Sequence, residues 1–309
     1  MKLINQKAEL LPQQDWKKQI ELAARTCYKS EDKIAEGTAE KMVDMLIKRK
    51  HYAMLEHGTI YLHCHSVSMV TLKMYNKYYF NPYSRAKISN DKNDVYITTN
   101  YRVIKEHGWK DDLKYLCEPT DNHVKRYTFR LTTSIGIVRE LLRHRVFSFA
   151  NESTRYCNYS KDKFNNEITF VEPYWLYKAT KLQQIEFEFY CKTAEDTYLA
   201  LLGKWDERKS DRRFKTGFKD NPLTPQAARE VLPLCTKSEL IMTGFEDDWK
   251  NFLDVRLRGT TGKPHPDMFE LATLISNQLN IDRMANSKPI QITMADYLDA
   301  YGLEVNYEL

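Results

Sequence analysis

The residues best suited to chemistry are three arginines and a histidine that crowd one short span. Arg143, His144 and Arg145 are consecutive, and Arg155 follows shortly after them. Guanidinium groups bind phosphate through paired hydrogen bonds, so this span is suited to a nucleotide or to a phosphate-bearing cofactor. By composition alone, a solvated basic helix end that complements the helix dipole is the more common case.

A helix must position these side chains. Ile135, Val138 and Leu141 form an apolar stripe that predicts a helix running into Arg143, His144 and Arg145, and we expect residues 146–156 to form a loop. If Arg143 and Arg145 are both helical, their side chains diverge by about 200°. They would then contact two different anionic groups, and Arg155 would supply a third contact.

The remaining periodicities predict an α+β fold, with a mixed or antiparallel sheet flanked by helices in a single domain over residues 1–309. Residues 72–127 are rich in Tyr, Asn, Lys and Asp, so we expect a surface insertion with a weak helix at 109–117. Strands are expected at 58–67, 127–133 and around 240–242. Helices are expected at 14–28, 38–50, 178–203, 246–258 and 266–284, with a short one capped by Thr224 and Pro225.

Composition narrows the class of protein. With 42% hydrophobic and 12% aromatic residues the chain can bury a large core, and its net charge of +5 favours anionic ligands without demanding a nucleic acid. The six cysteines contain no C-x-x-C pair, which favours free thiols over a zinc or redox site. No apolar stretch approaches the ~20 residues that a membrane span needs, so we expect a cytoplasmic protein.

The basic span also carries a family signature. Arg143-His144-Arg145, seven residues and then Ser153 form a pattern that resembles the signature of the flavin-dependent thymidylate synthases. Similar blocks to that family occur, in the same order, at residues 23–28, 55–57, 228–233 and 251–256. The resemblance covers residues 1–71 and 128 to about 285 and leaves only the insertion unmatched.

The resemblance implies the reductive methylation of dUMP to dTMP. FAD reduced by NADPH would supply the hydride, and methylenetetrahydrofolate would supply the carbon. The family also implies a homotetramer with active sites at subunit interfaces. Cofactor contacts are expected from His57, Thr59, Arg143, His144, Arg145, Asn151 and Asn251. Substrate contacts are expected from Glu140, Arg143, Asn151, Glu152, Ser153, Thr154, Arg155, Arg229 and Arg256.

Three positions depart from the family pattern. Asn151 stands where a glutamate or glutamine is common, Phe245 replaces an asparagine of the cofactor site, and Glu140 replaces a glutamine that contacts the nucleotide.

Arg256 is the candidate catalytic residue. It shares a helix face with Trp249, Phe252 and Leu253, so its stem could simply pack there while the charge reaches water. At the family position it would instead lie against the pyrimidine and stabilise negative charge that develops on the ring.

The histidines and cysteines could have structural roles instead of functional ones. A lone histidine such as His57 is more often structural than functional, although the family position lies beside the flavin ring. His57, His63 and His65 share a strand parity that could mimic a metal site, but no carboxylate recurs at matching positions, so we expect no metal. Cys157 and Cys235 are expected to be inert packing thiols, because the flavin mechanism needs no protein nucleophile.

A rival class is a nucleic-acid-binding protein that would use the arginines and the insertion. Stacking rings and positive charge alternate there, as in single-strand binding surfaces, at Tyr75, Lys77, Tyr78, Tyr79, Tyr83, Arg85 and Lys87. Packing of this segment against another subunit is the alternative that we favour.

Overall fold

A four-stranded antiparallel sheet forms the centre of the computed structural model, which describes residues 1–66, 68–204 and 221–279. Its strand order is β2 (Lys7–Leu11), β6 (Arg126–Ser134), β9 (Lys237–Phe245) and β7 (Ser148–Asn151). Side chains alternate along β9: Leu240 and Met242 enter one hydrophobic core, whereas Ile241 enters the core on the opposite face. The sheet is therefore covered on both sides.

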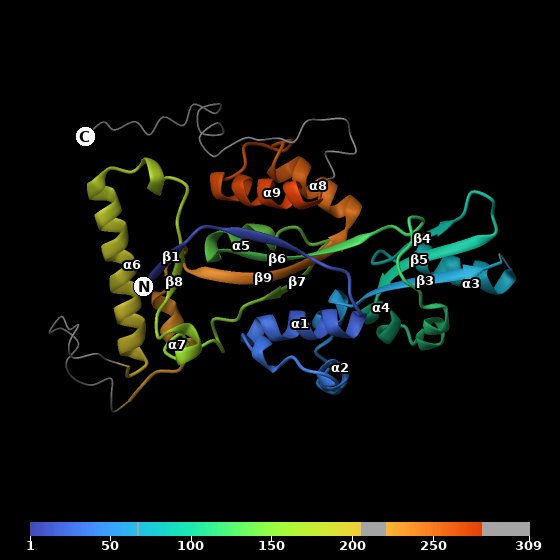
Figure 1. Ribbon diagram of the computed structural model, residues 1–309, viewed down its shortest axis with the longest axis horizontal. Helices are drawn as coiled ribbons and strands as arrows, with labels where there is room; N and C mark the ends of the chain where they lie inside the picture. The colour runs from blue at the N-terminus through green and yellow to red at the C-terminus, as the bar shows by residue number, and fades with distance from the viewer. Residues whose placement is uncertain (67, 205–220, 280–309) are drawn as a thin grey trace.

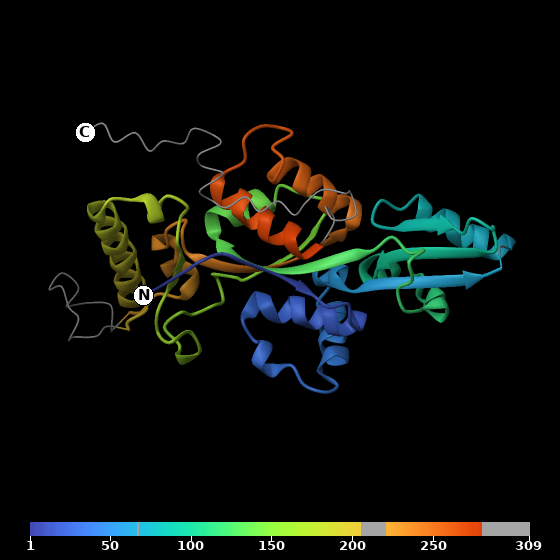
Figure 2. The same ribbon diagram turned by 45° about the horizontal axis from the view of Figure 1, so that its top comes forward.

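Helices form the two outer layers (Figures 1 and 2). One face of the sheet carries α5 (Ile135–Leu141), α8 (Glu246–Arg256) and α9 (Pro266–Leu279), and the other carries α1 (Trp16–Tyr28) and α2 (Thr38–Lys48). The expected α+β fold with an antiparallel sheet flanked by helices is confirmed. The predicted end of the last helix, residues 280–284, lies outside the described residues.

A second sheet projects from one end of the molecule, with the order β3 (Thr59–His65), β5 (Asp94–Asn100) and β4 (Arg85–Ile88). The strand expected at 58–67 is present as β3, and its residues Ile60, Leu62 and Cys64 are fully buried. Two helices flank this sheet, α3 (Met69–Tyr79) and α4 (Tyr101–Glu106).

Most of this second sheet belongs to residues 72–127, which we expected to be a surface insertion. That expectation is wrong as regards the surface: β5 pairs with β3 along its whole length, and Tyr78, Ile97 and Ile104 are buried in the same core as α1. The polar composition of the segment was misleading because its strand β5 and the helices beside it still bury apolar residues such as Val95 and Ile97, although Phe80 and Tyr83 are exposed. The weak helix at 109–117 is a 3₁₀ helix, Lys110–Tyr115.

The opposite end holds the parallel pair β1 (Lys2–Ile4) and β8 (Thr169–Val171), the long helix α6 (Lys181–Leu201) and the short α7 (Pro225–Ala228). A capping box at Thr180 and Gln183 begins α6. No helix within the described ranges is long and apolar enough to cross a membrane. The remaining 3₁₀ helices are Glu31–Lys33, Tyr52–His57, Asp162–Phe164, Leu176–Lys178 and Arg229–Val231.

Candidate functional site

A cationic cavity of 850 Å³ lies where the two sheets meet. Its wall contains Arg143, His144 and Arg145, and Arg85 and Arg126 raise the number of lining arginines to four. Two carboxylates, Glu56 and Asp248, line it as well. The other lining residues are Pro82, Tyr83, Asn100, Val146, Phe147, Ser148, Phe149, Gly244, Phe245 and Asn251.

The Arg-His-Arg segment is a turn, not a helix end. The helix α5 stops at Leu141, and the turn is held by the backbone bond from Phe147 N to His144 O (3.1 Å). Arg143 and Arg145 therefore line the same cavity, which corrects the expected divergence of about 200° along a helix.

The expected loop at 146–156 is also partly wrong, because Ser148–Asn151 forms the strand β7 at the edge of the central sheet. Phe147 is buried just before this strand and packs against Trp249 at a centroid distance of 4.6 Å. A Cβ at Gly244 would collide with the Phe147 ring, so glycine is required there. This close packing fixes where the Arg-His-Arg turn ends.

Arg256 joins two other predicted site residues. Its Nε donates to His144 Nε2 (2.9 Å), and its Nη1 pairs with Glu140 Oε2 (2.9 Å). Burial, reinforced by the Arg256 cation, lowers the pKa of His144 to about 4. At neutral pH His144 is therefore uncharged and accepts through Nε2, and the guanidinium is held in one orientation. Free snorkelling to water does not describe this arginine, because its side chain is only 19% exposed.

Thr59 lies behind the cavity wall and is linked to it through Arg126, whereas His57 contacts Thr243. Nη1 of Arg126 donates to Thr59 Oγ1 (3.1 Å) and to the Glu56 carbonyl oxygen (3.1 Å). Burial lowers the pKa of Arg126 to about 10, so it remains a cation at neutral pH. His57 is fully buried, its Nδ1 lies 2.9 Å from Thr243 Oγ1, and burial lowers its pKa to about 3. A neutral histidine thus supports the wall.

Residues that sequence reasoning missed complete the cavity. Tyr83, Arg85 and Asn100 come from the segment expected to be an insertion. The guanidinium of Arg85 lies 4.3 Å from the Phe245 ring centroid, and that of Arg126 lies 5.3 Å from it. Phe245 therefore replaces the expected asparagine with a ring that positions two cations. No local pattern signals Arg126, which is distinguished only by its burial.

The predicted nucleotide contacts form a separate group. Arg229 Nη1 donates to Thr154 Oγ1 (3.5 Å), and Arg155 Nε donates to Gln226 Oε1 (3.1 Å). Ser153 precedes them and donates its backbone N–H to Cys27 O (2.9 Å). None of these described residues lines the cavity.

Asn151 and Glu152 are engaged inside the protein. Asn151 Oδ1 accepts from Ser238 Oγ (2.8 Å). Glu152 is 1% exposed, pairs with Lys237 (2.7 Å) and accepts from Tyr159 OH (3.0 Å). Both side chains brace β7 against β9 and so hold the start of the following 153–155 segment.

The remaining candidates are the two cysteines, the tyrosine-rich run and the strand histidines. Burial raises the pKa of Cys157 to about 12, so its thiol is a poor nucleophile, and Cys235 lies 3.8 Å from Cys191, Sγ to Sγ. Tyr78 is fully buried and donates to Asp112 (2.7 Å), so the tyrosine run is not a continuous stacking surface. The expected lack of a carboxylate near the strand histidines is wrong, because Asp94 lies beside His63 and His65.

Comparison with known proteins identifies a family to which this chain is similar. The family model of the thymidylate synthase complementing protein matches residues 9–77 and 121–280. A flavin-dependent thymidylate synthase of Mycobacterium avium is 31% identical over 123 residues, 40% of this chain and 46% of that protein. The chain thus spans about half the length of that relative.

Two further relatives are matched over a larger share of their own length. A probable flavin-dependent thymidylate synthase of Paramecium bursaria Chlorella virus 1 is 26% identical over 46% of this chain and 61% of that protein. The flavin-dependent thymidylate synthase of Synechocystis is 25% identical over 60% of this chain and 77% of that protein. The family model matches well over half of the residues of this chain, so the chain belongs to the thymidylate synthase complementing protein family.

Proposed function

We propose that this protein is a flavin-dependent thymidylate synthase that converts dUMP to dTMP in the cytoplasm. Methylenetetrahydrofolate would supply the carbon, and NADPH would reduce the bound FAD. The observation that carries the proposal is the cavity walled by Arg143, His144 and Arg145 together with two further arginines and several aromatic rings.

The cavity suits a flavin dinucleotide. Its 850 Å³ falls in the usual range of ligand sites, about 300–1,000 Å³. Four arginines against two carboxylates favour the anionic pyrophosphate, and Phe149, Phe245 and Tyr83 offer faces for planar rings. Arg126 is buried, and its Nε has no acceptor among the described residues, as expected of a donor that awaits a ligand.

FAD, when bound, would supply the hydride that converts the transferred carbon to a methyl group. Arg143 and Arg145 would hold its phosphates, and Asn251 would offer an amide. Thr59 would hold Arg126 in the cavity wall, and His57 would support the wall through Thr243. Keeping His144 neutral prevents a further positive charge beside Arg256.

The nucleotide would use the second group of residues. Arg155 and Arg229, with the hydroxyls of Ser153 and Thr154, would bind the phosphate of dUMP. Arg256, preoriented by Glu140 and His144, would contact the uracil ring and stabilise negative charge that develops there.

A homotetramer would bring the two groups together. Within one chain the nucleotide group does not line the cavity, and a second subunit would supply it to a complete site. The long helix α6 offers an interface, because its exposed apolar residues repeat at helical spacing: Leu182 (68% exposed), Ile185 (49%) and Phe189 (64%).

Flavin binding tests the proposal. Arg143→Ala should weaken FAD binding at least about tenfold, which corresponds to 1.4 kcal/mol, in a fluorescence titration. Arg139→Ala is the matched control, because Arg139 is exposed on α5 and does not line the cavity. Equal FAD affinity in the two variants, or no flavin binding by the wild type, would contradict the proposal.

Subunit mixing tests the shared site. Arg143→Ala and Arg155→Ala should each have low activity alone and should recover about a quarter of wild-type activity when they are unfolded together and reassembled in equal amounts. If both residues serve a site within one subunit, mixing will restore nothing.

A further inference from the structure

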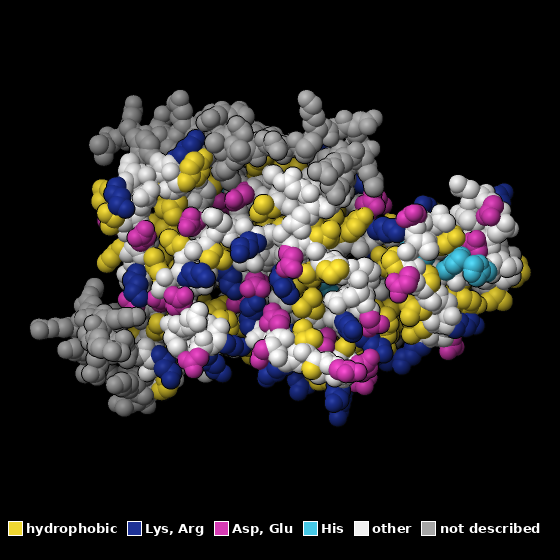
Figure 3. All heavy atoms as spheres, in the orientation of Figure 1, with side chains coloured by type: hydrophobic (Ala, Val, Ile, Leu, Met, Phe, Trp, Pro, Cys, Tyr) yellow, Lys and Arg dark blue, Asp and Glu magenta, His cyan; other side chains and the backbone are white. Residues whose placement is uncertain are grey.

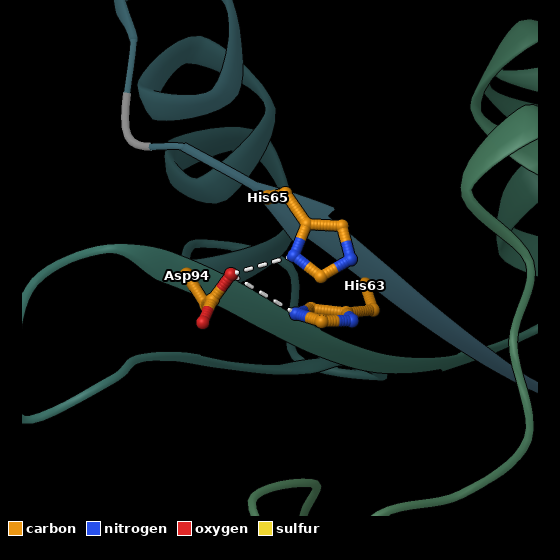
Figure 4. A group of neighbouring side chains, drawn as sticks. All are labelled: His63, His65 and Asp94. Carbon is orange, nitrogen blue, oxygen red and sulfur yellow. Dashed lines mark hydrogen bonds and ion pairs between the residues drawn. The ribbon is translucent and has the colours of Figure 1, made fainter.

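A histidine pair and a carboxylate gather at the far end of the small sheet (Figure 4). His63 and His65 lie two residues apart on β3, so their side chains share one face of the strand. Asp94 begins β5 and is the direct cross-strand partner of His65. None of the three lines the cationic cavity.

The three side chains converge on one carboxylate oxygen. Asp94 Oδ1 lies 3.2 Å from His63 Nε2 and 3.1 Å from His65 Nδ1. Only His65 is aligned to hydrogen-bond with it; His63 Nε2 is buried and makes no hydrogen bond within the described residues. A buried ring nitrogen that makes no well-aligned hydrogen bond is costly unless something else binds it.

The spacing is that of a metal coordination shell. In a tetrahedral zinc site with bonds of about 2.0–2.1 Å, neighbouring ligand atoms lie about 3.3 Å apart. The two nitrogen-to-oxygen distances, 3.2 and 3.1 Å, are close to this edge, and all three ligand atoms lie within 4.8 Å of one another. Small rotations of the exposed His65 would open the centre to a cation.

His63 is already fixed in place. Its ring stacks on Tyr96 at 4.5 Å with an interplanar angle of 8°, and His65 meets it edge-on at 4.1 Å. His65 is 83% exposed, which leaves the outer side of the cluster open to solvent and to a water ligand. Histidine side chains accordingly stand at the surface of this end of the molecule in Figure 3.

We propose that His63, His65 and Asp94 form a binding site for a divalent transition metal of the zinc class. Two imidazoles and one carboxylate favour zinc, cobalt, nickel or copper over magnesium and calcium, which prefer oxygen ligands. The site would join the ends of β3 and β5 and would leave coordination positions for water. His63 and His65 lie within the residues matched by the family model, whereas Asp94 lies between the two matched ranges.

Cobalt provides a direct probe. Metal-free protein without a polyhistidine tag should bind one Co²⁺ per chain with an intense visible band typical of tetrahedral coordination, and Zn²⁺ should displace it. His65→Ala and Asp94→Asn should each weaken binding at least about tenfold, the loss that even an outer-sphere partner produces. His51→Ala, another exposed histidine, is the control and should bind as the wild type does.

Metal binding can also be measured through thermal stability, which does not depend on the enzyme activity. Zn²⁺ should raise the melting temperature of the wild type but not of His65→Ala, whose exposed side chain is not needed for folding. Unchanged Co²⁺ binding in both variants, or no tetrahedral band in the wild type, would overturn the proposal and leave Asp94 only as a partner of the two histidine side chains.

Discussion

Replacing Arg256 tests whether the oriented guanidinium takes part in the reaction. In Arg256→Ala the bonds to His144 Nε2 and Glu140 Oε2, both 2.9 Å, are lost together. Both partners are partly exposed and can bind water instead, so the free energy of unfolding should fall by only ~1–2 kcal/mol. That is less than the stability of a typical domain, so the variant should fold and keep FAD.

The effect on turnover should be much larger. A preorganised donor that meets developing charge contributes about 2.7–4 kcal/mol, so kcat should drop on the order of 10²-fold or more. Arg256→Lys should restore little, because one ammonium cannot contact His144 and both the side chain and carbonyl of Glu140 as the fork does.

The assay compares kcat for dTMP formation with bound flavin measured by absorbance. Arg258→Ala is the matched control, since Arg258 follows Arg256 closely but pairs with Asp254 at the surface. Near wild-type kcat in an Arg256→Ala protein that retains FAD would refute the reasoning and leave a structural cation.

Three other results are expected. Burial lowers the pKa of His57 from 6.5 to about 3, so between these pH values the unfolded chain binds a proton that the folded protein does not. The free energy of unfolding should therefore fall as the pH drops from 6.5 to about 3. The slope approaches about 1.4 kcal/mol per pH unit; His57→Gln should flatten this decline in urea titrations, whereas His65→Gln should not. Phe189→Asp should convert the proposed tetramer to smaller species, as measured by mass photometry, because it charges the exposed apolar stripe of α6. Lys237→Met leaves the buried Glu152 carboxylate unpaired and should cost about 3–5 kcal/mol of stability in denaturant titrations; loss of less than 1 kcal/mol would mean that water enters there.

Much of the fold could be predicted from periodicity. The helices at 14–28, 38–50, 178–203 and 246–258 match α1, α2, α6 and α8 to within a few residues. Helices α1, α2 and α8 each bury one apolar face, whereas α6 leaves Leu182, Ile185 and Phe189 exposed. The turn at Arg143 and the strand β7 were missed, since the local pattern continues the helix and only pairing with β9 stops it.

The residues of the candidate site were likewise predicted only in part from the sequence. Arg143, His144, Arg145 and Asn251 were predicted and do line one cavity. Arg85 was missed because polar composition suggested a surface segment, and its role depends on a sheet pairing that no short motif encodes. Asp94 was missed for a similar reason, because strand parity compares residues within one strand and says nothing of the neighbouring strand.

Release of tritium from C5 of labelled dUMP measures the central claim most directly. With FAD, NADPH and methylenetetrahydrofolate, the wild-type protein should release tritium to water in step with dTMP formation, and omission of any one component should stop product formation. Arg143→Ala should lower the rate, whereas Arg139→Ala should not. No dTMP from protein that is folded, tetrameric and saturated with FAD would contradict the account.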